Sequence, residues 1–302
     1  MATRLMAGVD VGGTRVKSVL ADDDGSVLFS HTASTPERPG AGVVDVIVDA
    51  VTTLLDLARA DGIDGRLAAV GAVVPGLVDE ATGSAAWSAN LGWRDLPLRD
   101  LLRSRFDVPV AVGHDVRAGL LAEFHLGAAK GVPDALFVPL GTGIASALLA
   151  SGRVVAGTEW TGEIGHVTVQ PGGPVCGCGR RGCLEAVASA SALGRAWREL
   201  GRDGDAETLS LAVADGDPEA IRLWEDAIDA LVRVIGPVCA AAGTRVVLIG
   251  GGLALSGAVL LEPLRDRLVS VLGHDRIIVT RAALGDRAGA LGATLLAMEA
   301  TA

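Results

Sequence analysis

Three cysteines and one histidine lie close together in the middle of the chain, at a spacing suited to a metal ion. Cys176, Cys178 and Cys183 stand in a glycine-rich segment, and His166 precedes them. Three thiolates and one imidazole complete a tetrahedral Zn²⁺ shell with no open position, which is typical of a structural site. The alternative is a set of buried or redox cysteines, and the spacing favours the metal. A closed shell cannot activate water, so the zinc is expected to take no direct part in chemistry.

Three glycine-rich turns suggest phosphate binding. The first is Asp10-Val11-Gly12-Gly13-Thr14, and the others are the Gly-Thr-Gly of 141–143 and the Gly-Gly-Gly-Leu of 250–253. Glycines let backbone N–H groups approach a phosphate closely, and Thr14 adds a hydroxyl donor. Asp10 can orient Mg²⁺ through water. Each turn alone is compatible with an ordinary hairpin, but three at corresponding strand ends favour a nucleotide site. None matches the usual P-loop or dinucleotide fingerprint.

An aspartate that follows a predicted strand is the candidate general base. His114-Asp115 lies where the strand Val108–Val112 ends and a helix begins. An aspartate in this position commonly caps the helix. The other reading is a carboxylate that takes the proton of an attacking hydroxyl during phosphoryl transfer. Together with the glycine turns, we favour the base.

Two glutamates flank the cysteine cluster, and a fourth cysteine lies far from it. Glu163 and Glu185 are either solvated charges or, if they are fixed beside a pocket, acceptors of hydrogen bonds from sugar hydroxyls. Cys239 stands in an apolar helical stretch and is expected to be a core residue.

The elements that must position these residues follow from hydrophobic periodicity and turn residues. The pattern of three strands, a helix and then alternating strands and helices returns in the second half, and it predicts two α/β units with a ligand crevice between them. The expected strands are Met6–Val9, Val16–Ala21, one beginning at Val27–Phe29, Leu67–Val74, Val108–Val112, Ala135–Leu140, Ile144–Leu149 and Arg245–Ile249. The expected helices are Val43–Ala60, Val116 to about Leu126, Leu184–Leu200, Glu219–Ala241 and roughly Arg287–Glu299.

Composition limits the partners. The chain has 302 residues, of which 50% are hydrophobic and 21% charged, and a formal net charge of −10. An acidic globular protein is not expected to bind nucleic acid or a membrane surface. We see no membrane-spanning segment and no signal peptide, so we expect a cytoplasmic protein.

Taken together, these residues resemble the ROK family (repressors, open reading frames and kinases), and in particular its bacterial glucokinase-like enzymes. The resemblance covers nearly the whole chain, and its most specific part is the cysteine segment. It rests on DVGGT at 10–14, VPGLVD at 74–79, NLGW at 90–93, the aspartate at 115, GTG at 141–143, GEIGH at 162–166, CGCGRRGCLE at 176–185 and GGGL at 250–253.

The resemblance implies an actin-like ATPase (RNase H-like) fold with two α/β domains and an inter-domain cleft. The expected division is a small N-terminal domain, 1–113 plus about 286–302, and a large zinc-bearing domain, 114–285. Implied partners are ATP, Mg²⁺, structural Zn²⁺ and a sugar, in a homodimer or homotetramer. The implied reaction is transfer of the γ-phosphoryl group to O6 of a hexose, with Asp115 as base. Implied sugar ligands are Gly76, Asn90, His114, Asp115, Glu163, His166 and Glu185. Implied nucleotide ligands are Asp10, Gly12, Gly13, Thr14, Arg15, Gly141, Thr142, Gly143, Gly251 and Gly252, and the implied metal ligands are His166, Cys176, Cys178 and Cys183.

Departures from the family pattern bear on the substrate. His114 replaces an asparagine whose amide usually meets sugar hydroxyls around C3 and C4. Glucose is the default substrate, and His114 makes a glucose analogue altered near C3, such as the 3-amino sugar kanosamine of antibiotic biosynthesis, a serious variant. Arg15 replaces a common lysine, and Ala145-Ser146 replaces a glycine pair, which affects the details of the phosphate loop.

Other readings stay open at this point. One is an N-acetylglucosamine or N-acetylmannosamine kinase. Another is a sugar-responsive transcriptional regulator of the same family, although Asp10 stands too near the start for a preceding DNA-binding domain. The stretch GTGIASAL at 141–148 also resembles polyphosphate-using relatives. Those relatives lack the cysteine cluster, so ATP is the expected donor.

Overall fold

The computed structural model describes residues 3–88 and 91–301, and in it the chain divides into two compact units. The first unit is made of Met1–His125, Ala156–Thr161 and Asp286–Ala302, and the second of Leu126–Val155 and Gly162–Gly285. Residues 114–125 thus group with the first unit, whereas the sequence-based boundary lies at 113. The physical reason is that Ala118 packs in one cluster with Val73 and Ala293, which belong to the first unit.

The first unit is built on a five-stranded sheet with the order β3-β2-β1-β4-β8. β1 pairs antiparallel with β2 and parallel with β4, and β4 pairs parallel with β8. The strands are β1 Thr3–Val11, β2 Arg15–Ala21, β3 Val27–Ser34, β4 Gly65–Val74 and β8 Val110–His114. The unit also contains the helices α1 Val43–Ala60, α2 Leu98–Arg103, α3 Asp115–Leu126 and α9 Ala288–Glu299.

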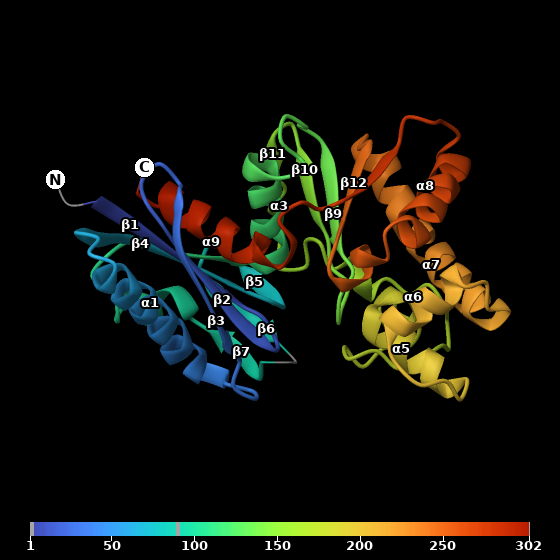
Figure 1. The fold of residues 1–302 in the computed structure, drawn as a ribbon, viewed down its shortest axis with the longest axis horizontal. Helices are drawn as coiled ribbons and strands as arrows, with labels where there is room; N and C mark the ends of the chain where they lie inside the picture. The colour runs from blue at the N-terminus through green and yellow to red at the C-terminus, as the bar shows by residue number, and fades with distance from the viewer. Residues whose placement is uncertain (1–2, 89–90, 302) are drawn as a thin grey trace. The chain divides into compact units, whose positions relative to one another are not determined.

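Alternate residues of β1 face different helices. Leu5, Ala7 and Val9 belong to the cluster that includes the apolar face of α1, while Met6 packs with Ala297 of α9 on the opposite face. Figure 1 shows α1 and α9 on the two sides of this sheet. Gly8 lies so close to the backbone of α9 that a Cβ there would overlap the Ala290 carbonyl oxygen. The helix therefore rests directly on the strand, next to the end that carries Asp10.

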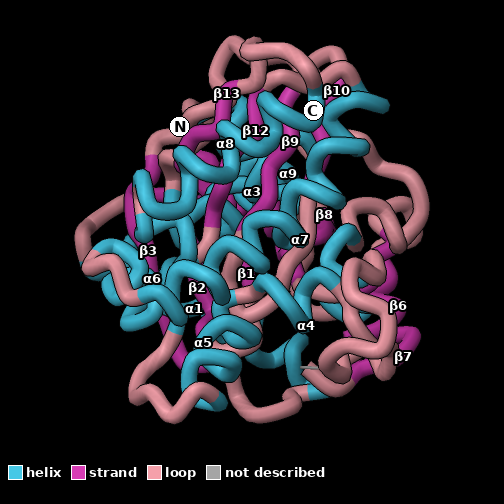
Figure 2. The backbone as a smooth tube through the Cα atoms, turned by 90° about the vertical axis from the view of Figure 1, so that its right-hand side faces the viewer, coloured by secondary structure: helices cyan, strands magenta, loops and turns pink. Residues whose placement is uncertain are grey.

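The second unit has a five-stranded sheet with the order β11-β10-β9-β12-β13, in which β9, β12 and β13 are parallel. Figure 2 shows β13, β12, β9 and β10 side by side. The strands are β9 Ala135–Pro139, β10 Ala147–Ala150, β11 Arg153–Val154, β12 Val246–Gly250 and β13 Ile278–Arg281. The helices are α4 Leu184–Ala188, α5 Ala190–Glu199, α6 Ala206–Ala214, α7 Pro218–Ala242 and α8 Ala258–Leu272.

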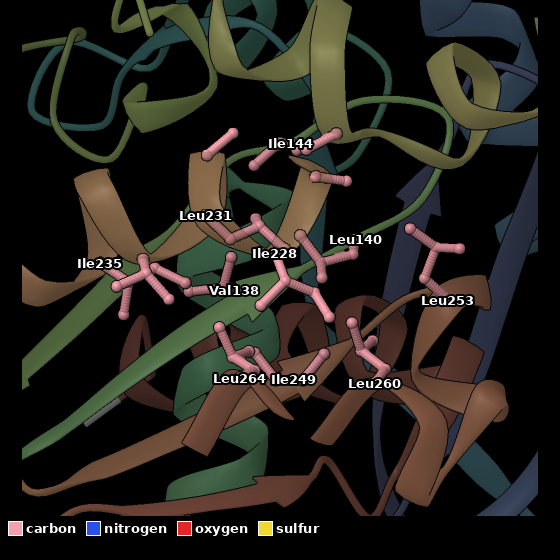
Figure 3. Close-up of a cluster of buried hydrophobic side chains, with 14 of the residues drawn as sticks. Val138, Leu140, Ile144, Ile228, Leu231, Ile235, Ile249, Leu253, Leu260 and Leu264 are labelled. Atoms are coloured by element: carbon pink, nitrogen blue, oxygen red, sulfur yellow. The ribbon is translucent and has the colours of Figure 1, made fainter. Parts of the chain in front are cut away.

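The core of this unit lies between the sheet and the long helix α7. Ile228 and Leu231 of α7 are buried together with Val138 of β9 and Ile249 of β12, and Leu264 of α8 belongs to the same cluster (Figure 3). Burying these aliphatic side chains fixes the ends of β9 and β12 in the register Gly250↔Pro139. The two glycine turns that follow these strands are thereby held next to each other.

Some elements differ from those predicted. The expected helix Leu184–Leu200 breaks at Ser189, because the Ser189 backbone is extended and its Oγ accepts the Ala192 N–H as the cap of α5. A three-stranded sheet, β5 Leu77–Asp79, β6 Ser84–Ser88 and β7 Trp93–Leu96, was not predicted. Nor were α2, α6, α8 and β13. Among the described residues no helix combines the length and apolarity needed to cross a membrane.

Candidate functional site

The first glycine turn closes the hairpin between β1 and β2. The Gly12 N–H donates to the Arg15 carbonyl at 2.9 Å, and the Thr35 hydroxyl donates to the Gly12 carbonyl at 2.7 Å. Gly13, Thr14 and Arg15 are exposed on this turn. The turn therefore has a fixed backbone and an open outer face, as a phosphate-contacting loop requires.

Asp10 stands at the end of β1 in an acidic environment. Its pKa is raised to about 7, mainly by burial and next by the negative charge of Asp115; Lys17 opposes this rise and Asp286 adds to it. Lys17 lies opposite Asp10 in the hairpin register and forms an ion pair with Asp286 at 3.6 Å. Partly uncompensated carboxylates of this kind suit a divalent cation, whose charge would favour the ionised form of Asp10.

Replacing Asp10 with asparagine is expected to make the metal-free protein more stable at alkaline pH. Folded Asp10 keeps its proton up to about pH 7, whereas the unfolded side chain releases it near its ordinary value of 3.8. The contribution of the Asp10 carboxyl group to the free energy of unfolding is therefore greatest at low pH and is lost as the pH rises through 7. The advantage of Asp10→Asn should grow from pH 4 to pH 8, by up to about 4 kcal/mol, in urea unfolding with EDTA.

Asp23→Asn is the matched control, because Asp23 is an exposed carboxylate elsewhere in the same unit. It should show no comparable pH-dependent gain. An Asp10→Asn advantage that stays constant between pH 4 and pH 8 would mean that the pKa of Asp10 is not raised in the folded protein.

His114 and Asp115 lie where β8 ends and α3 begins. His114 is buried, with 2% of its surface exposed, and its Nδ1 lies 3.2 Å from the Val116 N–H and 3.3 Å from Asp115 Oδ1. The Asp115 side chain is 26% exposed, and it also accepts from the Val116 N–H at 2.7 Å. Asp115 therefore contacts its own helix start and still has access to solvent.

Gly76 lies between β4 and β5 and has φ +99°. A Cβ at this position would overlap the Trp87 carbonyl oxygen, so only glycine fits without rearrangement. Asn90, the other residue predicted near this loop, lies outside the described residues.

In the second unit, two glycine turns meet at the ends of paired strands. The Leu140 N–H donates to the Gly250 carbonyl at 2.9 Å, and the Leu253 N–H donates to the Leu140 carbonyl at 3.1 Å. Gly251 has φ +74°, and a Cβ there would overlap the Leu140 carbonyl oxygen. The Gly141–Gly143 turn and the Gly251-Gly252 turn are thus adjacent, as a shared nucleotide site requires.

Glu185, which was predicted as a sugar ligand, also holds the Gly141–Gly143 turn. Its Oε2 accepts the Ile144 N–H at 3.0 Å, and a Cβ on Gly143 would come within 2.5 Å of the same oxygen. Its other oxygen lies 3.8 Å from Cys176 Sγ. One carboxylate therefore connects the cysteine segment with a glycine turn.

The four predicted metal ligands lie together, with one ligand atom from each within 4.8 Å of all the others. His166 Nδ1 lies 3.6 Å from Cys176 Sγ, and Cys178 Sγ lies 3.7 Å from Cys183 Sγ. Bonds of about 2.3 Å from zinc to sulfur and about 2.0 Å to nitrogen place tetrahedral ligands at such separations, so the residues fit Zn²⁺. Short backbone turns shape the cluster, among them the Cys176 N–H to the Arg180 carbonyl at 2.8 Å.

His166 presents its two ring nitrogens to different partners. Nδ1 faces Cys176, and Nε2 lies 3.7 Å from Glu163 Oε2. Glu163 thus lies next to His166, and Glu185 lies next to Cys176. Cys239 lies in the hydrophobic core, and burial raises the pKa of its thiol to about 11, as an inert core cysteine requires.

The predicted residues gather in two groups, one in each unit. Asp10, the 12–15 turn, Gly76, His114 and Asp115 belong to the first unit. The sequence-based analysis missed Lys17 and Asp286 beside Asp10. The position of Lys17 beside Asp10 could have been predicted from the hairpin, because counting residue pairs outward from the turn pairs Val11 with Val16 and Asp10 with Lys17. Asp286, far along the chain, gave no such signal. The second unit holds Gly141, Thr142, Gly143, Glu163, Glu185, Gly251, Gly252 and the metal ligands.

Two α/β units with glycine turns at their strand ends define an actin-like ATPase fold, and solved structures with this chain's architecture have that fold. The ROK family model matches residues 6–300, and the chain therefore belongs to the ROK family. This confirms the resemblance seen in the motifs.

Several relatives of this chain are sugar kinases. The glucokinase of Thermotoga maritima is 33% identical over 97% of this chain and 97% of its own length. The N-acetylmannosamine kinase of Citrobacter koseri is 30% identical over 96% and 97%. A ROK family glucokinase from Streptomyces griseus, solved in complex with glucose and AMPPNP, superposes with a TM-score of 0.80 at 30% identity, covering 98% of this chain and 99% of that one.

Proposed function

We propose that this protein is an ATP-dependent hexose kinase that phosphorylates O6 of glucose or of a glucose analogue altered near C3. The observation that carries the proposal is the Cys₃His cluster, which has Glu163 beside His166 and has Glu185 between Cys176 and a glycine turn. The Streptomyces griseus glucokinase, which matches this chain over almost its whole length, was solved with glucose and AMPPNP, and this supports a sugar and a nucleotide as the ligands here.

In the proposed reaction, Asp115 accepts the proton of the sugar O6 hydroxyl. The O6–phosphorus bond forms as the bond between the γ-phosphorus and the β-phosphate oxygen breaks, and ADP leaves. The turns at Gly12–Arg15, Gly141–Gly143 and Gly251-Gly252 hold the phosphates and adenosine. Asp10 would hold Mg²⁺ through water, and the chemistry supplied there is neutralisation of phosphate charge.

The zinc site proposed at His166, Cys176, Cys178 and Cys183 is structural. With all four positions filled by protein atoms, such an ion has no place for water or substrate. Its contribution would be to fix the His166 ring and the start of α4, which carries Glu185. Glu163, the Nε2 side of His166 and Glu185 then meet the sugar hydroxyls.

A sugar panel with ATP tests the proposal. Glucose, kanosamine, N-acetylglucosamine and N-acetylmannosamine would be compared by kcat/KM, with ³¹P NMR locating the phosphate on the product. We expect glucose or kanosamine to be preferred, with phosphate on O6. A preference for an N-acetyl sugar would replace the proposed substrate, and the N-acetylmannosamine kinase relative makes this the second candidate. Turnover of no sugar would contradict the kinase itself.

His114→Asn sharpens the substrate question, because asparagine is the residue more common in the family. If His114 selects a sugar altered near C3, the ratio of kcat/KM for kanosamine over glucose should fall by about tenfold or more. An unchanged ratio would mean that His114 does not read that part of the sugar.

A further inference from the structure

A buried arginine near the start of α3 has a role that the proposed reaction does not use. Arg117 is only 4% exposed, although its side chain carries a full positive charge. Burying a charge is unfavourable unless it is paired and fully hydrogen-bonded. The surroundings of this guanidinium therefore have to supply specific partners.

Each nitrogen of the Arg117 guanidinium has such a partner. Nε donates to Glu80 Oε1 at 2.8 Å, one terminal nitrogen donates to the Thr161 carbonyl at 3.1 Å, and the other donates to the Val78 carbonyl at 3.1 Å. The three acceptors come from two stretches of the first unit, Val78 and Glu80 from one and Thr161 from the other. A planar fork reaches all three at once, whereas the point charge of a lysine does not.

The carboxylate oxygen that pairs with Arg117 also holds the residue beside the proposed base. Glu80 Oε1 accepts the backbone N–H of His114 at 2.9 Å. The same oxygen lies 3.5 Å from where a Cβ on Gly113 would stand. The Glu80 carboxylate thus fixes the last residues of β8, immediately before Asp115.

Glu80 is itself held by a compact turn. Asp79 Oδ1 accepts the N–H groups of Ala81 at 3.0 Å and Thr82 at 3.2 Å. Hydrogen bonding to Thr82 lowers the pKa of Asp79, so the turn keeps its acceptor across the neutral range. Glu80 therefore reaches His114 and Arg117 from a defined backbone.

We infer that Glu80 and Arg117 are positioning residues that set the orientation of Asp115 through the His114 backbone. The inference rests on the proposed function, because it assigns a task only if Asp115 is the base. A displacement of about 1 Å in a catalytic group can lower a rate about 100-fold. The pair acts on the placement of the carboxylate and not on nucleotide binding, so kcat should change while the KM for ATP does not.

The test compares Arg117→Lys and Glu80→Gln with the wild-type protein. Arg117→Lys keeps the charge but loses the fork, and Glu80→Gln keeps the shape but loses the charge. Each should lower kcat by about 10- to 100-fold and leave the KM for ATP within about threefold. Circular dichroism and thermal melting show whether each variant folds. If Arg117→Lys does not fold, the kcat of Glu80→Gln provides the test.

Arg99→Lys is the matched control. Arg99 donates to the Ala81 carbonyl at 2.9 Å and to the Glu80 carbonyl at 3.5 Å, so it supports the same turn without touching the Glu80 carboxylate. It should keep the kcat of the wild type. A loss equal to that of Arg117→Lys would show that general disruption of the turn explains the effect.

The decisive step repeats Arg117→Lys in an Asp115→Asn background. If Arg117 acts by orienting Asp115, the second substitution should cost little further activity, because the group it positions is gone. An equal further loss, or a kcat for Arg117→Lys within twofold of the wild type, would overturn the inference. A wild-type protein that phosphorylates no sugar would overturn the proposed function instead, and the positioning role with it.

Discussion

Asp115→Asn is expected to lower kcat by about 1000-fold or more while the sugar still binds. Asparagine matches the shape of aspartate and its capping ability, but it cannot accept the O6 proton. The hydrogen bond from the Val116 N–H to Asp115 Oδ1 should survive, because the amide oxygen of asparagine can accept it as well. Steady-state turnover, together with sugar binding measured by calorimetry, checks both parts of this expectation.

Asp217→Asn provides the control for a purely structural aspartate. Asp217 caps α7, and its Oδ1 accepts the N–H groups of Glu219 at 2.9 Å and Ala220 at 3.1 Å. Its replacement should change the melting temperature slightly and leave kcat intact. If Asp115→Asn behaves like Asp217→Asn and keeps a near-normal kcat, then Asp115 is a helix cap and the base lies elsewhere.

Cys183→Ala is expected to remove the bound metal and to destabilise the second unit. Cys183 is fully buried and directly precedes α4, so a lost ligand loosens both the metal segment and the helix that carries Glu185. Zinc measured by mass spectrometry should fall from about one ion per chain towards none. The melting temperature should fall with it, because metal binding contributes to the folding free energy.

Cys239→Ala separates this effect from the loss of any buried thiol. Cys239 is 2% exposed but belongs to the hydrophobic core and not to the cluster. The variant should keep its zinc and lose only about 1–2 kcal/mol of stability through the small cavity. Full zinc occupancy in Cys183→Ala, or no zinc in the wild type after refolding with it, would contradict the proposed site.

The sequence predicted well where local patterns decide the structure. Short apolar segments on either side of the Gly12-Gly13 turn predicted β1 and β2, and Val43–Ala60 is a helix over the predicted span. The CxC spacing with His166 placed four ligands together, because short glycine-rich turns leave few ways for such a segment to fold. The predicted helix Leu184–Leu200 failed at Ser189, where a local cap competed with periodicity.

Tertiary packing decided the contacts between residues far apart in the chain. Glu185 was predicted as a sugar ligand from its motif, but its bond to the Ile144 N–H depends on how α4 meets the end of β9. The ion pair of Glu80 with Arg117 joins residues that are 37 positions apart, and no local sequence pattern predicts it. Such pairs arise from the folded path of the chain, which no local pattern encodes.

By itself, the sequence determined the family, the order of most elements and the residue types of the candidate site, because these depend on local periodicity and on short motifs. The tertiary structure alone showed that acidic neighbours surround Asp10, that Leu140 ties two glycine turns together, and that a buried guanidinium supports the strand before Asp115. Each of these depends on burial and on distances between separate segments, and these exist only once the chain has folded.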